Sequence, residues 1–365
     1  MVNYTKGVGC VRKTGLLAMA AAIFLLFGCA CMTPENDASP DGPEAACSVE
    51  MLDVGEGLCI LAEMDGHYLL YDGGGRETSS LVVRHLRDKG VGRLDIMVAS
   101  HYDEDHISGL IGVLSDIPVD RVIAPDYEAE TSIFRSFQKK LADSSAELLS
   151  PYPGDRYPMG DGEILILGPG REHYEIENDR SVAVLLTFGK FRCLITGDAE
   201  SKAELQMTES SRDLSADLYV AGHHGSASSS TCRFLEAVHP RYVFFSCGAD
   251  NPYGHPAARV LDAVRDEGAE IFRTDRQGSV TAYTDGEFLW FSAEPCDDWA
   301  PGTVAEHKTP VPGKEEYILN QRTMRFHRPD CESAAKMNPE NRVLSRDSRE
   351  DLIARGYLPC GVCNP

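Results

Sequence analysis

The chain has 365 residues, and 42% of them are apolar, which is enough for one large core that needs no disulfides and for a small second module. Its formal net charge of −22 repels polyanions, so the composition excludes a basic nucleic-acid-binding module. Any nucleic acid would have to bind through local positive groups or through metal ions.

The N-terminus has the pattern of a lipoprotein signal peptide, which we place at residues 1–29. The apolar run over residues 16–27 follows basic residues and is shorter than the ~20 residues that span a bilayer. Leu26-Phe27-Gly28-Cys29 resembles a bacterial lipobox, in which the cysteine is acylated, and Cys31 is a weaker alternative. We therefore expect an exported protein, anchored to the cell membrane by a lipid on Cys29 and facing outward; an uncleaved anchor is the alternative.

Composition and periodicity divide the rest of the chain into four parts. Residues 30–46 are rich in proline and acids and predict a flexible linker. Residues 47–295 alternate short β-like runs with helical stretches, which predicts a layered α/β domain with mixed sheets. The periodicity is lost over residues 296–316, which predicts a second linker, and residues 317–365 form a separate small module.

Within the large domain, apolar runs predict strands, and apolar residues at helical spacing predict helices. The predicted strands cover residues 49–53, 68–71, 94–100, 121–124, 164–167, 182–188, 191–196, 218–221 and 242–246. The predicted helices cover residues 107–114, 132–141, 201–209, 232–238 and 257–267. Hairpins are expected to turn at Gly189-Lys190 and at Thr284-Asp285-Gly286.

Several of the twelve cysteines lie in apolar surroundings, where cysteine behaves as a small hydrophobic residue. We expect Cys59, Cys193, Cys232 and Cys247 to be buried in the core. Cys47 and Cys296 flank the large domain, and a disulfide between them is an alternative that the sequence leaves open.

A dense group of metal-binding residue types follows the strand predicted at residues 94–100. His101-Tyr102-Asp103-Glu104-Asp105-His106 leads directly into a predicted helix. A strand-end loop that runs into a helix N-terminus can direct closely spaced side chains to one point. Imidazole nitrogens and carboxylate oxygens are ligands of divalent first-row metals. The sequence therefore predicts a metal site here rather than a solvated acidic loop.

Three more predicted strands end in histidine or aspartate. Thr196-Gly197-Asp198 follows one strand, Gly222-His223-His224-Gly225-Ser226 the next, and Tyr253-Gly254-His255-Pro256 lies after a third. Any one of these residues would more often be a turn or surface residue. Together with the first group, they indicate a single metal-binding edge.

Together these motifs resemble the metallo-β-lactamase superfamily, and specifically the domain attached to ComEC-type competence DNA-uptake proteins. The resemblance covers roughly residues 48–292 and includes Leu52-Asp53-Val54-Gly55-Glu56-Gly57, Tyr71-Asp72-Gly73-Gly74 and Arg273-Thr274-Asp275. It implies an αββα sandwich with a metal site at one edge. It also implies that the metal ligands are His101, Asp103, Asp105, His106 and Asp198, with one histidine of the His223/His224 pair.

The chain differs from many superfamily members at two positions, where it agrees with the ComEC-type branch. Many members have histidine in place of Asp103 and another near Asn178. Oxygen ligands shift the preference from zinc towards manganese or magnesium. We therefore expect one or two divalent ions, with manganese preferred and zinc as the alternative. In addition, Leu58 follows Gly57, where ComEC-type domains usually have an acid.

The resemblance implies a metal-dependent extracellular hydrolase, and we expect a phosphodiesterase or nuclease that acts on DNA. Asp198 would bridge if two metals bind, and Asp105 would orient water. His224 or His255 would protonate the leaving oxygen, while Asp72 and Asn178 would support the ligands. The alternatives are a cell-wall or choline-phosphate phosphoesterase and a non-catalytic DNA- or zinc-binding surface adaptor. We expect no transmembrane channel in this chain.

The C-terminal module predicts a structural zinc site of His327, Cys331, Cys360 and Cys363, in H-x3-C and C-x2-C pairs. Because a module this short has little core, metal binding would supply much of its folding free energy. It resembles the small zinc-binding domain related to the N-terminal part of the Ada repair protein, with a histidine in place of one cysteine. Three arginines could contact phosphates or could simply be solvated: Arg322, Arg325 and Arg328.

Overall fold

The computed structural model describes residues 45–170, 174–249, 251–303, 317–320, 322–329, 331–338, 341–345, 352, 357–360 and 363. The predicted signal peptide with Cys29, nearly all of the first linker and most of the second lie outside the described residues. In the part of the chain that is described, no helix is long and apolar enough to cross a membrane.

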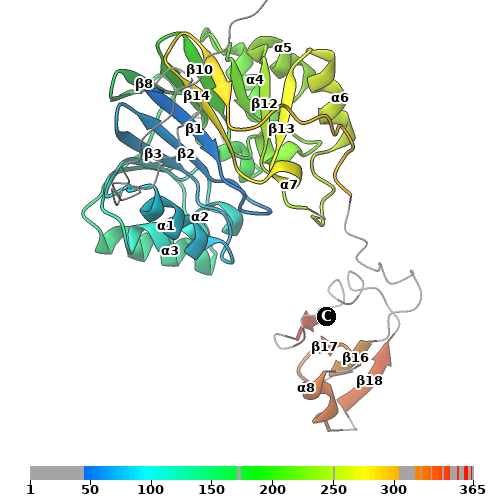
Figure 1. The fold of residues 1–365 in the computed structure, drawn as a ribbon. Coiled ribbons are helices and arrows are strands. Elements are labelled where there is room, and N and C mark those ends of the chain that lie inside the picture. Colours follow the sequence, from blue (N-terminus) through cyan, green and yellow to red (C-terminus); the bar gives the residue numbers. More distant parts are fainter. Residues whose placement is uncertain are drawn as a thin grey trace, which may run out of the picture. The chain divides into compact units, whose positions relative to one another are not determined.

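The large domain consists of two facing β-sheets with helices on both outer faces (Figure 1). The first sheet has the order β15 (Leu289–Phe291), β14 (Val280–Thr284), β1 (Cys47–Met51), β2 (Ile60–Met64), β3 (His67–Tyr71), β4 (Leu94–Val98), β5 (Val119–Ile123), β6 (Glu147–Leu149). The second has the order β13 (Glu270–Arg273), β12 (Tyr242–Phe245), β11 (Leu218–Val220), β10 (Phe191–Ile195), β9 (Val184–Phe188), β8 (Gly162–Ile166), β7 (Arg156–Met159).

Each sheet buries its outer face under its own helices. The first sheet packs against α1 (Ser79–Asp88), α2 (Glu104–Leu114) and α3 (Ser132–Asp143). The second packs against α4 (Ser201–Glu209), α5 (Cys232–Val238) and α6 (Ala258–Asp266). Short turns at strand ends form η1 (Asn178–Arg180), η2 (Gly222–Gly225) and α7 (Thr274–Gln277). This αββα arrangement confirms the predicted fold class.

Strand direction decides where the functional loops emerge. Strands β3 to β6 run parallel to one another, as do β10 to β13, so consecutive strands in each run end at the same edge of their sheet. The other neighbouring pairs are antiparallel, and the two predicted hairpins, β9–β10 and β14–β15, are confirmed. Residues that directly follow parallel strands are thereby gathered at one edge of each sheet.

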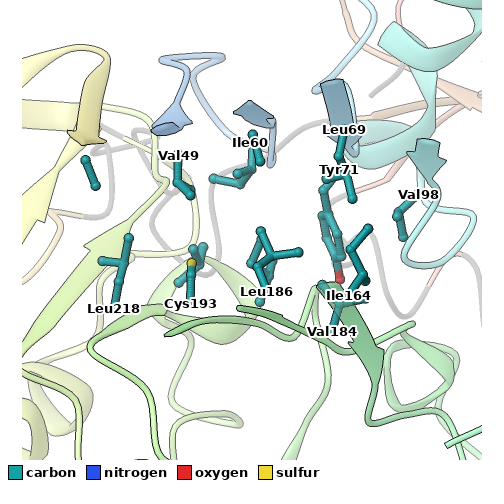
Figure 2. Packing of buried hydrophobic residues seen from close by; sticks show 14 of the residues in the cluster. Val49, Ile60, Leu69, Tyr71, Val98, Ile164, Val184, Leu186, Cys193 and Leu218 are labelled. Carbon is teal, nitrogen blue, oxygen red and sulfur yellow. The ribbon is translucent and has the colours of Figure 1, made fainter. Parts of the chain in front are cut away.

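The central core lies between the two sheets. Figure 2 shows Val49, Ile60 and Tyr71 of the first sheet facing side chains of the second, such as Leu186 and Cys193. The fully buried Tyr71 hydroxyl also donates a 2.6 Å hydrogen bond to the carbonyl oxygen of Val182, which lies just before β9. Each large apolar side chain buried here contributes about 1.5–3 kcal/mol.

The predicted secondary structure is most accurate where helices carry a regular apolar face. Helices α4 and α5 match the predicted bounds, and α2 begins at Glu104, so that Asp105 and His106 lie in its first turn. The prediction missed α1, β2, β6, β7 and β13. In α1 only Val82 and Leu86 are buried, and so narrow an apolar stripe gives a weak signal.

The cysteine predictions hold except at one position. Cys59, Cys193 and Cys247 are buried, but Cys232 is exposed, so its predicted burial is wrong. It is the first residue of α5, and the buried stripe of that helix begins two residues later, at Phe234. Cys47 and Cys296 are both free thiols and belong to different hydrophobic clusters.

Residues 296–303 pack against the large domain, whereas the sequence predicts that a linker begins at residue 296. The Cys296 N–H donates to the Ile271 carbonyl oxygen at 2.7 Å, and the Gly302 N–H donates to the Pro256 carbonyl oxygen at 2.9 Å. The buried Arg273 guanidinium donates to the Asp298 carbonyl oxygen at 2.9 Å. The segment is held by these hydrogen bonds and by Cys296 and Trp299, which pack against the core without a regular spacing. This irregular spacing explains why it resembles a linker in sequence.

The C-terminal module has its own small sheet, with the order β18 (Arg342–Ser345), β16 (Tyr317–Asn320), β17 (Arg325–His327) and β19 (Leu358–Pro359). A short helix, α8 (Glu332–Ala335), completes its described elements. Among its described residues, the buried apolar side chains form two small clusters, one around Phe326 and Leu352 and one that includes Ile318 and Ala334.

Gly109 of α2 allows this helix to approach the loop after β3, and we expect Gly109→Ala to be destabilising. A Cβ at Gly109 would lie 1.8 Å from the Gly73 carbonyl oxygen. The backbone must move to relieve this clash, so the free energy of unfolding should fall by about 2 kcal/mol or more in urea denaturation.

Gly112→Ala is the matched control on the same helix. Its Cβ would meet the Ser79 hydroxyl, at 2.5 Å, and that side chain can rotate away. Alanine gains helix propensity over glycine, so this variant should be within about 1 kcal/mol of wild type or more stable. Equal losses in the two variants would contradict the proposed close contact.

Candidate metal centre

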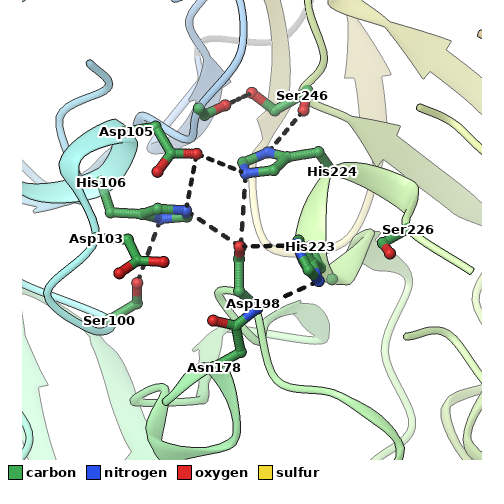
Figure 3. Close-up of polar contacts among 12 residues, drawn as sticks. Ser100, Asp103, Asp105, His106, Asn178, Asp198, His223, His224, Ser226 and Ser246 are labelled. Carbon is green, nitrogen blue, oxygen red and sulfur yellow. Dashed lines mark hydrogen bonds and ion pairs between the residues drawn. The ribbon is translucent and has the colours of Figure 1, made fainter. Parts of the chain in front are cut away.

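The candidate centre lies where strands of both sheets end (Figure 3). Loops after β3 and β4 bring residues from the first sheet, and loops after β10, β11 and β12 bring residues from the second. The side chains that meet or border there are Asp72, His101, Asp103, Asp105, His106, Asp198, His223, His224 and His255.

The carboxylate of Asp198 is the centre of the group and is almost completely buried. Its Oδ1 lies 3.3 Å from His106 Nε2 and 3.6 Å from His224 Nε2. Its Oδ2 lies 3.6 Å from His223 Nε2 and 4.0 Å from His101 Nε2. The two oxygens therefore face two different pairs of imidazoles.

Each pair of imidazoles has a second carboxylate beside it, that of Asp105 at the His106/His224 pair and that of Asp103 at the His101/His223 pair. Asp105 Oδ2 lies 3.5 Å from His224 Nε2 and 3.7 Å from His106 Nε2. Asp103 Oδ2 lies 3.5 Å from His101 Nε2. Both carboxylates are partly exposed, so the centre opens to solvent on their side.

Several nitrogen and oxygen atoms that could bind a metal are buried without a hydrogen-bond partner, and this residue set fits a cation. Within the described residues, His101 Nε2, His106 Nε2, His224 Nε2 and Asp198 Oδ1 are buried without a hydrogen-bond partner. Buried polar atoms normally have partners, because leaving them unpaired costs free energy. Two overlapping groups could hold a metal ion: His101, His106 and Asp198, and Asp105, His106 and His224.

Hydrogen bonds at the opposite ring nitrogens orient the imidazoles. His106 Nδ1 lies 2.8 Å from Asp72 Oδ2, and His224 Nδ1 lies 3.0 Å from the Ser246 carbonyl oxygen. A carboxylate or carbonyl oxygen only accepts here, so both Nδ1 atoms carry a proton and donate it. Nε2 of each ring therefore faces the centre, and a metal ion that displaces the proton of this nitrogen meets its lone pair.

At this edge the backbone adopts left-handed conformations that residues other than glycine seldom adopt. Asp72, His223 and His224 have φ values of 55°, 50° and 55°. Such strain is tolerated where the surrounding structure fixes it, commonly at functional sites. Gly197, before Asp198, also has positive φ, and a Cβ there would lie 2.7 Å from Ser100 Cβ.

Electrostatics keep the carboxylates ionised in this buried place. Burial alone would raise the pKa of Asp198, but the imidazoles of His106 and His224 outweigh it and hold that pKa well below its usual range. The same two histidines lower the pKa of Asp105 against the effect of burial. Conversely, Asp198 and Asp105 raise the pKa of His106 well above its usual value despite burial. A cation would therefore meet ionised carboxylates.

The remaining predicted residues lie around this group. Asn178 Nδ2 lies 3.4 Å from His223 Nδ1. The ring centroid of His255 is 5.7 Å from that of His223, and His255 Nδ1 is 3.2 Å from Glu56 Oε1. His223 is more exposed than His224, and burial lowers its pKa.

Some contacts in the centre were not predicted from sequence. Glu200 Oε1 lies 3.4 Å from His223 Nδ1, and its position two residues after Asp198 was the available signal. Ser181 Oγ accepts a 3.1 Å hydrogen bond from the Asp198 N–H. The Ser246 carbonyl and the pairing of Glu56 with His255 have no local signal, because their partners are distant in sequence.

A second candidate metal site lies in the C-terminal module. Ligand atoms of His327, Cys331, Cys360 and Cys363 all lie within 4.8 Å of one another. His327 Nδ1 is 3.6 Å from Cys331 Sγ, and this contact lowers the pKa of the Cys331 thiol. The set of one imidazole and three thiols is a common ligand set of structural zinc.

A family model for the metallo-β-lactamase superfamily matches residues 52–248. The chain therefore belongs to the metallo-β-lactamase superfamily, whose fold is associated with metal-dependent hydrolases.

Within the superfamily, the chain is similar to competence proteins. It is 31% identical over 261 residues to competence protein ComA of Neisseria gonorrhoeae, covering 71% of this chain and 35% of that one. It is 24% identical over 276 residues to ComE operon protein 3 of Bacillus subtilis (strain 168), covering 71% and 34%. The chain thus spans about a third of the length of these curated relatives.

Among solved structures, the metallo-beta-lactamase fold protein YhfI from Bacillus subtilis aligns with a TM-score of 0.42 and 16% identity. The alignment covers 67% of this chain and 99% of YhfI.

We expect Asp72→Asn to weaken metal binding without a comparable loss of stability. An amide in place of the carboxylate can donate to His106 Nδ1, which would move the ring proton to Nε2 and remove the lone pair that faces the centre. Loss of such a supporting carboxylate typically costs about 10–100-fold in metal affinity. Isothermal titration with Mn²⁺ measures this directly.

Asp95→Asn is the control, because Asp95 Oδ1 lies at the same 2.8 Å from a histidine Nδ1, that of His67, outside the centre. It should leave the Mn²⁺ affinity unchanged. Wild-type affinity in Asp72→Asn would contradict the orienting role of Asp72.

Proposed function

We propose that this protein is a metal-dependent phosphodiesterase that hydrolyses DNA. The observation that carries the proposal is the convergence of buried donor atoms without hydrogen-bond partners on Asp198, at an edge that opens towards solvent. The similarity to competence proteins supports DNA as the substrate. Since the chain spans about a third of those relatives, the substrate belongs to the proposal.

We assign the proposed ligands to two metal positions, and Asp198 belongs to both. Its Oδ1 belongs with Asp105, His106 and His224, and its Oδ2 belongs with His101, Asp103 and His223. Asp198 would then bridge two cations. In this assignment both members of the His223/His224 pair contribute. Glu200 Oε1, 3.4 Å from His223 Nδ1, can accept the proton of that nitrogen, and Asn178 borders the same ring.

The metal preference follows from the ligand types. The three carboxylates Asp103, Asp105 and Asp198 make the centre rich in hard oxygen ligands, which favours manganese over zinc. Divalent ions in such sites lower the pKa of water and offset the charge of a phosphoryl oxygen.

The protein side chains supply orientation and proton transfer. Asp105 is partly exposed beside His106 and His224, where its second oxygen can accept a hydrogen bond from the attacking water. His255 is the proposed proton donor to the leaving oxygen, because His224 is committed as a ligand. Glu56 holds His255 Nδ1 and accepts the Gly248 N–H at 3.1 Å, which fixes the ring near the centre.

The direct test is an assay of the purified protein with Mn²⁺ against plasmid DNA, single-stranded DNA and p-nitrophenyl phosphocholine. Cleavage of DNA supports the proposal. Cleavage of the phosphocholine ester alone would replace it with the cell-wall or choline-phosphate alternative, and no cleavage of any substrate would support a binding role.

We expect Asp105→Ala to abolish hydrolysis and to leave the fold intact. Its side chain pairs with His106 and His224 of the centre and is partly exposed, so its loss creates no core cavity. Glu104→Ala is the control, because the adjacent Glu104 is exposed and pairs with Arg76. Undiminished Mn²⁺-dependent activity in Asp105→Ala would refute the assignment, and circular dichroism checks the fold.

We also propose one structural zinc ion in the C-terminal module. The full chain should carry one zinc more than Cys360→Ser, measured by native mass spectrometry. Cys232→Ser, which removes an exposed cysteine of α5, should keep the wild-type zinc content. Equal zinc content in all three proteins would contradict the site.

The lipoprotein signal peptide, lipidation of Cys29 and membrane anchoring stay proposals of the same kind. Incorporation of labelled palmitate in a bacterial host, lost in Cys29→Ser, would test them.

A further inference from the structure

The segment that follows β15 lies against the loop that carries His255, and we call residues 298–302 of this segment the strap. The Gly302 N–H donates to the Pro256 carbonyl oxygen at 2.9 Å. A Cβ at Gly302 would lie 1.9 Å from the His255 carbonyl oxygen, so the two backbones are in direct contact. The strap therefore reaches the peptide unit of the proposed proton donor.

The strap is fixed by two arginines at and after the end of β13. The fully buried Arg273 guanidinium donates to the carbonyl oxygens of Asp298 and Ala300, at 2.9 and 2.5 Å. Asp298 Oδ1 accepts the Ala300 N–H at 2.9 Å, and its Oδ2 accepts from Arg276 Nε at 2.7 Å. Because a buried guanidinium without acceptors costs free energy, the strap is a fixed part of the large domain.

The loop itself is braced from within by the buried side chain of Asn251. Its Oδ1 accepts the N–H groups of Tyr253 and His255 at 3.1 and 2.9 Å. Its Nδ2 donates to the carbonyl oxygens of Gly248 and His255 at 2.9 and 2.6 Å. These four bonds use the full hydrogen-bonding capacity of the amide. The last of them ends on the same carbonyl oxygen that Gly302 contacts.

The ring of His255 lies at the side of the centre. Its Nδ1 is 3.2 Å from Glu56 Oε1, and its centroid is 5.7 Å from that of His223 and 6.3 Å from that of His224. Glu56 holds only one end of this side chain, so the direction of the ring also depends on where the His255 backbone lies. A misplacement of about 1 Å in a reacting group can cost about 100-fold in rate.

We propose that the strap positions His255, through the carbonyl oxygen that it shares with Asn251, and that cleavage of phosphodiesters with poor leaving groups depends on it. The inference rests on the proposed function, in which His255 protonates the leaving oxygen. The bond between phosphorus and that oxygen breaks as the bond to the attacking water forms, and the proton of the water restores the donor. A sugar alkoxide needs this proton, whereas p-nitrophenolate leaves readily without it. The catalytic unit then extends to at least residue 302, beyond the predicted boundary at residue 295.

The test uses the full chain with Mn²⁺ and two substrates that differ in leaving group. A short fluorescein-labelled thymidine oligonucleotide releases a sugar alkoxide, and bis(p-nitrophenyl) phosphate releases p-nitrophenolate. The strap variants are Gly302→Ala and Asp298→Ala, and His255→Ala is the reference for loss of the donor. Gly92→Ala is the matched control, because a Cβ there meets open space and neither glycine has positive φ.

We expect Gly302→Ala to lower kcat for the oligonucleotide about 10–100-fold, because the new Cβ displaces the His255 peptide. Asp298→Ala, which removes the bonds to Ala300 and Arg276, should cause a smaller loss in the same direction. In both variants, hydrolysis of bis(p-nitrophenyl) phosphate should fall far less than cleavage of the oligonucleotide. Gly92→Ala should match wild type on both substrates.

A double variant distinguishes positioning from a general loss of stability. If Gly302 acts through His255, the variant that combines His255→Ala with Gly302→Ala should cleave the oligonucleotide as fast as His255→Ala alone. A further loss in the double variant would overturn the inference.

The other outcomes separate this inference from the proposed function. If the strap variants cleave the oligonucleotide like wild type, or lose both activities equally, the inference is overturned while the phosphodiesterase stands. If wild type cleaves neither substrate, the proposed function fails and hydrogen exchange of the amides around His255 decides: faster exchange in Gly302→Ala than in Gly92→Ala supports the strap, and equal exchange overturns it. If Gly302→Ala does not fold, Asp298→Ala decides by the same comparisons.

Discussion

The buried carboxylate of Asp198 is the constraint on which the arrangement of the edge depends. An ionised carboxylate without partners is very costly to bury, and four imidazoles lie within 4.0 Å of this one. These imidazoles come from loops of both sheets, so the charge can be accommodated only when the two halves of the sandwich are correctly packed. The strand order, the Tyr71 hydrogen bond across the core and the close approach at Gly109 all serve that alignment.

A second layer of contacts decides what the imidazoles can do. Asp72 and the Ser246 carbonyl oxygen accept hydrogen bonds from Nδ1 of His106 and His224. The opposite nitrogens of these rings are therefore directed at Asp198. For His223, the oxygens that can accept from Nδ1 are Glu200 Oε1 at 3.4 Å and Ser228 Oγ at 3.2 Å. The chemistry of the edge therefore depends on residues that lie behind the imidazoles and do not face Asp198.

The sequence was most informative where a polar residue comes a few positions after an apolar run. His101, Asp198 and His224 follow β4, β10 and β11 in this way, and such a break in hydrophobicity is visible without a structure. It was least informative where a partner is remote: Glu56 and His255 are 199 residues apart, and no local pattern links them. The missed helix α1 has a narrow apolar stripe, and residues 296–303 are fixed by the buried Arg273 rather than by their own periodicity.

The positive φ angles of Asp72, His223 and His224 have a consequence for how the centre would be loaded. Each such residue carries a backbone strain of order 1–3 kcal/mol, which is offset by the packing of the rest of the domain. The free energy that holds these side chains in their inward orientation thus comes from folding of the domain and not from binding of an ion. Capture of a cation then requires little ordering of the chain, and its release would leave a receptor of nearly the same shape, ready for the next ion.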